Sequence, residues 1–194
     1  MQRFIAALLL FASLQLAAQP KLNVIYKKET KVFDVQDSTK VTQDAPTLYY
    51  LNLTKTVSEY FLVTENFDES KYIPTNFLYK NMETNTYTQQ LESGEYVHNS
   101  LPKLDWVLKP ETKKILGYSV KKAILDLGAE KQVTAWYSNM TYQNGPENYH
   151  RLPGLILEIE VNEKINGQKQ RTTFTAIAVD LSKNTKTISD PAKP

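Results

Sequence analysis

Cysteine is absent from this chain of 194 residues. That absence excludes disulfide bonds, thiolate chemistry and metal sites built on cysteine. Glycine is scarce, with six residues, so glycine-rich loops that cradle phosphate groups are not expected. The two histidines, His98 and His150, lie far apart in the sequence and neither has a second histidine at metal-ligand spacing. We therefore expect no metal or other cofactor, and a fold stabilised by its hydrophobic core.

An excess of charge of one sign is also lacking. Lysine and arginine together number 23, and aspartate and glutamate together number 21, which gives a formal net charge of +2. Interspersed charges of both signs leave no electrostatic footprint for nucleic acid. No polybasic cluster indicates binding to anionic lipid. We therefore expect no nucleic-acid partner.

Residues 1–18 are typical of a secretory signal peptide. Arg3 supplies the positive charge, an apolar run extends from Phe4 to Ala18, and Leu16-Ala17-Ala18 ends it with small residues. The run is shorter than the roughly 20 residues that cross a bilayer, so a membrane anchor is the weaker alternative. The sequence predicts export, a single β-rich domain over residues 19–181 with no transmembrane span, and a flexible C-terminal tail over 182–194.

Most of the remaining chain alternates short β-compatible runs with polar turns, which is typical of antiparallel sheets. In the run 47–53, alternation places Tyr49, Leu51 and Leu53 on one face and Leu48, Tyr50 and Asn52 on the other. Only residues 53–61 and 105–114 could form helical turns. We expect a mainly β protein with one curved antiparallel sheet and minor helix.

Asn166-Gly167 predicts a β-hairpin, because both central positions of a type I′ turn require a positive φ. The turn fixes the register of the flanking strands, and a slip of one residue would move every side chain to the opposite face. Outward-facing pairs are Glu160–Thr173 and Glu158–Thr175. The expected core-facing pairs are Val161–Thr172, Ile159–Phe174, Leu157–Ala176 and Leu155–Ala178.

A series of motifs lies between residues 115 and 159. They are Ile115-Leu116-Gly117-Tyr118, Lys121-Lys122-Ala123, Ala135-Trp136-Tyr137, Asn144-Gly145-Pro146 and the run from Tyr149 to Ile159. Together they resemble the GLPGLI family of exported β-rich proteins, for which no activity is defined. The resemblance implies a periplasmic or secreted protein of the Gram-negative envelope. The signature positions are Gly145, Pro146, Leu152, Pro153, Gly154, Leu155 and Ile156. By its strand pattern the chain is also similar to LolA-like lipoprotein carriers, which implies a half-barrel.

Pro153-Gly154 is expected to form a type II turn, with glycine supplying a positive φ. The turn would steer the excursion 139–152 back into a strand, and a partner-binding loop is the alternative. The first glycine of the family hexapeptide is replaced here by Arg151. Either φ at residue 151 is ordinary in this protein, or the loop differs locally.

Candidates for catalysis are few. His150 lies in a polar segment beside Glu147 and Arg151, where a solvated loop histidine is expected rather than a general base. No nucleophile elbow, phosphate-binding loop or calcium loop occurs. We therefore expect a protein that is not an enzyme, and a hydrolase of envelope polymers is a distant alternative.

Aromatic residues are plentiful, with 12 tyrosines. Tyrosine and tryptophan combine an apolar ring with a polar tip, so they line either a core or a wet groove. If the sheet leaves a cavity, its expected lining is Tyr49, Leu51, Tyr60, Tyr118, Trp136 and Tyr149. The leading hypothesis is an envelope protein that binds a hydrophobic ligand or a protein partner on its curved sheet. The alternative is a structural or accessory subunit with a filled core, acting through an exposed edge or the 139–154 loop.

Export predicts a processed N-terminus. Cleavage after Ala18 leaves Gln19, or its cyclised form, as the first residue of the mature protein. N-terminal sequencing or intact-mass measurement of the protein from its native host checks this. A cytoplasmic product that retains Met1 would contradict it.

Overall fold

The computed structural model describes residues 20–37, 39–64, 66–68, 75–182 and 186–193, so the predicted signal peptide lies outside the described residues. The strands are β1 (Leu22–Phe33), β2 (Val41–Gln43), β3 (Thr47–Leu53), β4 (Val57–Val63), β5 (Thr75–Asn81), β6 (Thr86–Gln90), β7 (Tyr96–Ser100), β8 (Val107–Ile115), β9 (Tyr118–Asp126), β10 (Lys131–Ser138), β11 (Ile156–Ile165) and β12 (Gln168–Leu181).

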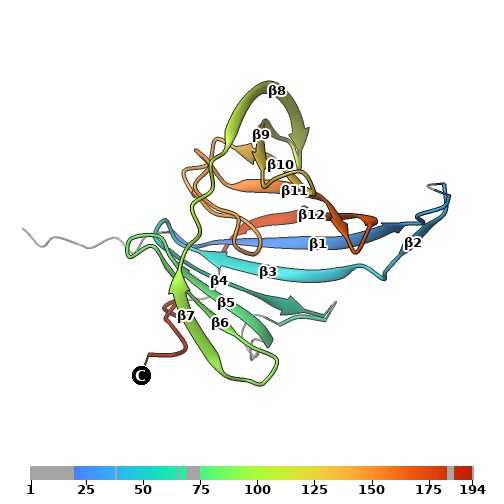
Figure 1. Cartoon of the computed structure of the whole chain (residues 1–194). Helices are drawn as coiled ribbons and strands as arrows, with labels where there is room; N and C mark the ends of the chain where they lie inside the picture. The colour runs from blue at the N-terminus through green and yellow to red at the C-terminus, as the bar shows by residue number, and fades with distance from the viewer. Residues whose placement is uncertain (1–19, 38, 65, 69–74, 183–185, 194) are drawn as a thin grey trace, which may run out of the picture.

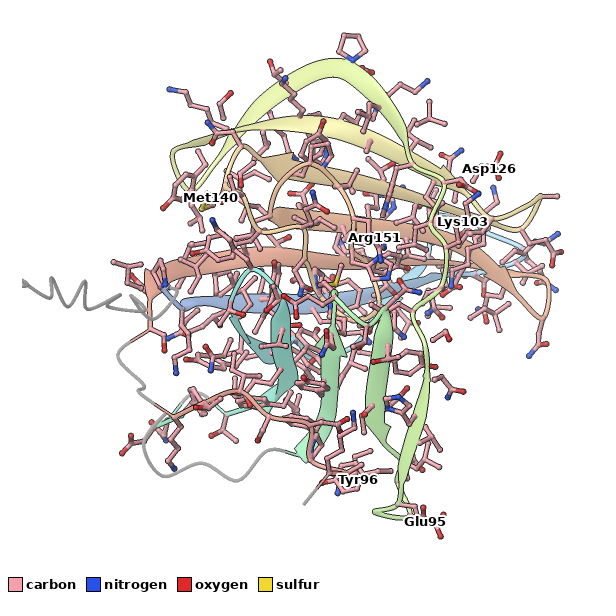
Figure 2. All side chains as sticks on the ribbon, turned by 90° about the vertical axis from the view of Figure 1, so that its left-hand side faces the viewer. Glu95, Tyr96, Lys103, Asp126, Met140 and Arg151 are labelled. Carbon is pink, nitrogen blue, oxygen red and sulfur yellow. The ribbon has the colours of Figure 1, made fainter. Side chains whose placement is uncertain are left out.

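These strands form one curved antiparallel sheet, as predicted (Figure 1). Its order is β7-β6-β5-β4-β3-β1-β12-β11-β10-β9-β8, with β2 paired to β1. The central strand β1 therefore joins an N-terminal half, β3–β7, to a C-terminal half, β8–β12. Strands β4, β5 and β6 run steeply across the direction of β1 and β12 (Figure 2). This strong twist curls the sheet around its inner face.

The minor helix predicted from the sequence is not present in the described part of the chain. Residues 54–56 form the turn between β3 and β4, residues 57–61 belong to β4, and residues 107–115 form the edge strand β8. Backbone pairing with β9 outweighs the weak helical preference of this segment, because local propensity is a small term beside tertiary pairing. Within the described ranges, no helix is long and apolar enough to cross a membrane.

Each face of the sheet carries its own hydrophobic cluster. The alternation predicted for β3 is confirmed, since Leu51 and Leu53 lie in the larger cluster on the inner face and Tyr50 lies in a smaller one on the outer face. The outer cluster also holds Phe61, Val63, Phe77, Tyr79 and Ile188. Among the buried residues of the inner cluster are Val24, Tyr26, Tyr60, Leu78, Leu125, Val133, Leu152, Leu155, Leu157, Ile159, Val161 and Phe174.

Two irregular segments close the inner face. Residues 101–106 connect β7 to β8, the two edges of the sheet, and therefore cross its open side (Figure 2). Residues 139–155 connect β10 to β11 and place Leu152 and Leu155, both fully buried, in the inner core. The two segments meet where the indole Nε1 of Trp106 donates a hydrogen bond to the carbonyl oxygen of His150 at 2.9 Å.

The predicted β11–β12 register is confirmed from Ile165–Gln168 to Glu158–Thr175. Asn166 and Gly167 have φ values of 50° and 83°, as the turn requires. The assignment of Ala178 to the core is wrong. The register between β1 and β12 shifts so that Ile25 pairs with Ala178 while Tyr26 pairs with Ala176, leaving the bulged Ile177 between them. A bulge adds one residue to the strand and so reverses the facing of every residue beyond it.

Gly154 does not form the predicted turn, because it is not among the glycines with positive φ. Its role is close approach instead. A Cβ atom at this position would lie 1.7 Å from the carbonyl oxygen of Ser138, and one on Gly145 would lie 2.8 Å from Cβ of Ile156. Both signature glycines therefore allow the 139–155 segment to pack directly against neighbouring backbone and side chains.

Arg151 has a φ of 63°, a conformation that glycine adopts far more easily. Its guanidinium Nη2 donates a hydrogen bond to Oδ1 of Asn85 at 2.6 Å, which helps to hold the residue in place. Of the two alternatives left by the sequence, an ordinary φ is thus excluded. The arginine takes the left-handed conformation at a cost of about 1 kcal/mol.

Part of the C-terminal segment packs on the outer face. Ile188 is only 6% exposed and joins the outer cluster. Lys21 Nζ donates a hydrogen bond to the carbonyl oxygen of Lys186. The carboxylate of Asp190 lies 3.9 Å from Nδ1 of His98. The described residues 186–193, within the segment expected to be a flexible tail, are thus in contact with the domain.

The facing of the β11–β12 hairpin is tested by a pair of substitutions. Phe174→Ala should lower the free energy of unfolding by about 3–5 kcal/mol, because it empties a fully buried site. Glu158→Ala removes only a surface ion pair with Lys113 and should cost about 1 kcal/mol or less. Chemical denaturation measures both values. Equal, small losses would contradict the assignment of faces.

The close approach at Gly154 is tested by adding one methyl group. Gly154→Ala should destabilise the fold by about 3 kcal/mol, because the new Cβ collides with backbone that cannot move alone. Arg151→Gly in the same loop is the control, and it should not destabilise, since glycine adopts the positive φ without strain. An unchanged denaturation midpoint for Gly154→Ala would rule out the close approach.

Candidate functional site

A buried lysine fastens the 139–155 segment to the sheet. Lys80 lies on β5 and its side chain is fully buried. Its ammonium donates hydrogen bonds to the carbonyl oxygens of Gly145, at 2.8 Å, and Glu147, at 2.6 Å. Burial penalises the charged form and lowers the pKa of Lys80 to about 7, although the nearby Glu147 carboxylate acts in the opposite direction. The lysine therefore connects β5, in the N-terminal half of the sheet, to the irregular segment.

Sequence analysis does not identify Lys80, since an isolated lysine in a strand usually faces solvent. The available signal is its place in the alternation, because Lys80 shares a face with the core residue Leu78. A neighbouring hydrogen bond also joins the 139–155 segment to the sheet. Asn144 Nδ2 donates to Oγ of Ser58 at 2.9 Å, and Ser58 is the residue that pairs with Lys80 across β4 and β5.

His150 is not the solvated histidine expected from the sequence. It is fully buried, and neither ring nitrogen has a hydrogen-bond partner among the described residues. Burial, together with the smaller effects of the positive charges of Lys80 and Arg151, lowers the pKa of His150 to about 4. The prediction failed because a polar local sequence does not reveal that residues 101–106 cross over the segment and exclude water.

A pocket of about 460 Å³ lies between the inner face of the N-terminal half and the tip of the 139–155 segment. The rings of Tyr49 and Tyr60 stack in its wall, with centroids 4.9 Å apart and planes only 4° from parallel. Glu147, whose carboxylate pairs with Lys28 Nζ at 3.2 Å, faces the pocket from the segment. The complete lining is Tyr49, Tyr60, Phe77, Leu78, Gln89, Gln90, Leu91, Glu92, Glu147 and Asn148.

Two polar groups at this pocket have no partner of their own. The hydroxyl of Tyr60 and Oδ1 of Asn148 are buried without a hydrogen bond to any described residue. Burial raises the pKa of Tyr60 well above its usual value, so its hydroxyl remains a neutral donor. Unpaired buried polar groups cost free energy, and a polar ligand in the pocket would relieve that cost.

The structure brings together only part of the predicted ligand set. Tyr49 and Tyr60 line the pocket, whereas Leu51 is fully buried in the core beneath the segment. Tyr149 packs beside Trp106 with ring centroids 6.3 Å apart. The remaining two predicted residues lie elsewhere.

Trp136 projects from the face opposite the buried Ala135, where Lys113 Nζ lies 4.4 Å from its ring centroid. Tyr118 is 36% exposed at the turn between β8 and β9. Both residues belong to the C-terminal half of the sheet, whereas the pocket is built on the N-terminal half.

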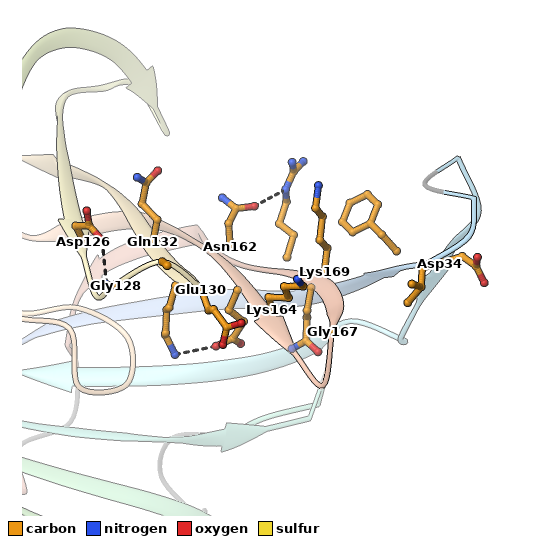
Figure 3. Close-up of a pocket in the computed structure, with 16 residues that line it drawn as sticks. Asp34, Asp126, Gly128, Glu130, Gln132, Asn162, Lys164, Gly167 and Lys169 are labelled. Carbon is orange, nitrogen blue, oxygen red and sulfur yellow. Dashed lines mark hydrogen bonds and ion pairs between the residues drawn. The ribbon is translucent and has the colours of Figure 1, made fainter.

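A larger hollow of about 890 Å³ lies at the far ends of β1 and of the β9–β10 and β11–β12 hairpins (Figure 3). Two of its charged side chains are engaged with other lining residues. Lys131 Nζ contacts Oε2 of Glu163 at 2.9 Å, and Arg171 Nε donates to Oδ1 of Asn162 at 3.1 Å. None of its described lining residues has a buried polar atom without a partner. The smaller pocket is therefore the better candidate for a ligand site.

The described residues offer no group of three histidine, aspartate or glutamate side chains that could hold a metal ion. The chemistry available at the pocket is therefore that of stacking on tyrosine and of hydrogen bonding to amides and carboxylates.

Comparison with solved structures identifies the fold. A crystal structure of PNGF-II in space group P21 matches with a TM-score of 0.60 and 19% identity, covering 86% of this chain and 29% of the other. The C2 crystal form gives a TM-score of 0.52 and 20% identity, covering 84% and 28%. The present chain thus spans less than a third of the length of PNGF-II.

A putative outer membrane lipoprotein-sorting protein domain from Vibrio parahaemolyticus also matches, with 10% identity, a TM-score of 0.35 and coverage of 84% of this chain and 87% of that one. At that score it supports no inference about a ligand. No curated protein matches the sequence.

Residues 26–192 match the family described as "N-glycanase peptide, N-terminal domain". The matching family is therefore not the GLPGLI family that the sequence motifs resemble. The expectation that the protein is not an enzyme is also overturned at the level of the family, because N-glycanases are enzymes, although the matching part is an N-terminal domain. Since the match extends over most of the chain, this protein belongs to the family of N-glycanase N-terminal domains.

Proposed function

We propose that this domain binds carbohydrate, and that it presents the glycan of a glycoprotein to N-glycanase chemistry. The site is the pocket beside the Tyr49–Tyr60 stack. The family match supports a role connected with N-glycans, and the stacked tyrosines in a polar pocket are the observation that carries the proposal.

The lining of the pocket favours a sugar over an acyl chain. Tyrosine offers a flat apolar ring with a polar tip, which suits a ligand that is apolar on one face and hydroxylated at its edges. Gln89, Gln90 and Glu147 also line the pocket and bring amide and carboxylate groups to it. An acyl chain could not hydrogen-bond to the buried Tyr60 hydroxyl and Asn148 Oδ1, and leaving these two groups unpaired is costly.

The hypothesis of a hydrophobic ligand on the curved sheet requires an open inner face. That face is occupied by the core and by Leu152 and Leu155 of the covering segment. The filled core instead supports the second hypothesis from the sequence, an accessory role. We combine the accessory role with sugar binding at the pocket, since a domain with a filled core and a peripheral sugar site can serve an enzyme as an accessory domain.

We further propose that the protein is exported to the periplasm or beyond. The support is the signal-like sequence around Arg3 and Ala17-Ala18. Glycoproteins or glycopeptides outside the cytoplasm would then be the partners of the site.

Binding of N,N′-diacetylchitobiose, the disaccharide at the base of N-linked glycans, tests the proposal. Titration followed by NMR or calorimetry should show saturable binding to the wild-type protein. Tyr49→Ala should weaken binding by roughly tenfold, equivalent to about 1.4 kcal/mol, because it removes the more exposed ring of the stack. Tyr118→Ala is the matched control and should bind like the wild type.

Absence of binding by chitobiose and by a longer N-linked glycan would refute the proposed function. Equal loss of affinity in Tyr49→Ala and Tyr118→Ala would show that the pocket is not the site. Saturable binding of oleate, blocked by Tyr49→Ala, would instead support the hydrophobic-ligand hypothesis.

A further inference from the structure

Residues 144–151, which we call the rim, involve two buried bases. His150 belongs to the rim, and Lys80 contacts it from β5. The rim supplies the carbonyl oxygens of Gly145 and Glu147 that accept hydrogen bonds from Lys80. It also carries His150, whose imidazole is fully buried with both nitrogens unpartnered among the described residues. The rim is thus held down by the buried amine of Lys80 and contains a second buried base, His150.

The surroundings offer His150 no counter-charge. Lys80 and Arg151 are both positive, and Arg151 is engaged with Asn85. Glu147 is the acidic residue of the rim, and its carboxylate is paired with Lys28. The hydroxyls of Tyr60 and Tyr149 stay neutral, because burial raises the pKa of each. The hydrogen bond of Trp106 goes to the backbone oxygen of His150 and not to its ring.

We propose that the rim is a pH-dependent clasp, closed on the sheet while His150 is neutral and released when its imidazole is protonated. A protonated ring in this site would be a buried charge with no partner, facing two other cations. Moving the rim into water is the available relief, because the rim is an irregular segment outside the strand ladders. The clasp deepens the proposed function, since Glu147 and Asn148 of the rim line the pocket.

The sign of the effect follows from proton linkage. The pKa of His150 is about 4 in the closed rim and near its usual 6.5 once the ring is in water, so the open state binds more protons. Acidification between pH 6.5 and 4 therefore lowers the ratio of closed to open rim, by up to about tenfold for each pH unit.

Lys80 adds a second, separate window. Its pKa is about 7 when closed and 10.5 when free, so alkaline pH between these values favours closure. A neutral amine retains two hydrogens and continues to donate to both carbonyl oxygens. Protonation of either His150 or Lys80 thus favours the open rim. For Lys80 this occurs as the pH falls from 10.5 to 7, and for His150 as it falls from 6.5 to 4.

Amide hydrogen exchange measures the clasp directly. The amides of Tyr149 and Arg151 are hydrogen-bonded to Pro146 and Gln143 and serve as reporters. After correction for the intrinsic pH dependence of exchange, their protection should fall by about tenfold between pH 6 and pH 5 in the wild type. His150→Leu, which preserves the apolar volume without a titrating group, should remove this dependence. Lys80→Met should lower protection at pH 8 and abolish the alkaline window.

His98→Leu is the matched control, because His98 is half-exposed on the outer face and should leave the profile unchanged. Where His150→Leu fails to fold, the NMR titration of the wild-type imidazole decides the question. A His150 pKa near 6.5 in the folded protein, or protection that does not change with pH, would overturn the clasp.

The same variants separate the clasp from the proposed function. If chitobiose binds at pH 7.5 and loses affinity at pH 5 in the wild type but not in His150→Leu, the clasp controls the site. If chitobiose does not bind at any pH while protection still falls on acidification, the clasp stands and the carbohydrate function fails. If binding is independent of pH and protection is constant, the clasp fails and the carbohydrate function stands.

Discussion

The pairing of β1 with β12 is the interaction that joins the two halves of this chain into one sheet. It joins the first described strand to the last along a ladder that runs from Leu22–Leu181 to Val32–Gln170. Because β1 also pairs with β3, the ladder connects the N-terminal meander to the C-terminal one. Without it the sheet would divide into two separate sheets, and the inner core, to which both halves contribute, would not be enclosed.

Irregular backbone that covers a curved sheet has buried carbonyl groups outside any strand ladder, and each of them needs a hydrogen-bond donor. Side chains that reach up from the sheet and its connections supply these donors. Tyr26 donates its hydroxyl to the carbonyl oxygen of Ile156, Lys80 donates to two carbonyls of the rim, and Trp106 donates to that of His150. The covering segment is therefore held less by its own regularity than by donors from β5 and from the 101–106 connection, while Tyr26 of β1 fixes the first residue of the strand that follows it.

Strain and unpaired groups gather where the segment meets the pocket. Glu147 and Arg151 both have positive φ values, His150 and Lys80 are buried bases, and the Tyr60 hydroxyl lacks a partner. Each of these features costs free energy. Their concentration beside the pocket supports its choice as the candidate site.

The fold class, the facing of β3 and the β11–β12 register are predictable from the amino-acid sequence, because these features depend on local rules. Alternation fixes which side chains share a face, and Asn166-Gly167 fixes the hairpin within a few residues. These rules do not predict that Ala178 faces away from the core, since the β-bulge that reverses its facing depends on pairing with the strand β1.

The burial and the contacts of the candidate-site residues follow only from how distant parts of the chain pack together. Gly154 looks like a turn residue in sequence but is required by a backbone 16 positions upstream, at Ser138. The local sequence predicts a solvated His150, but residues 101–106 cross above it. The local sequence likewise predicts a surface lysine at position 80, but the rim carbonyls cover its ammonium group. Tyr49 and Tyr60 were found by composition, yet their separation from Trp136 and Tyr118 follows from the opposite halves of the sheet to which they belong. Burial is a property of what the distant chain places on top of a residue, and a local pattern does not contain it.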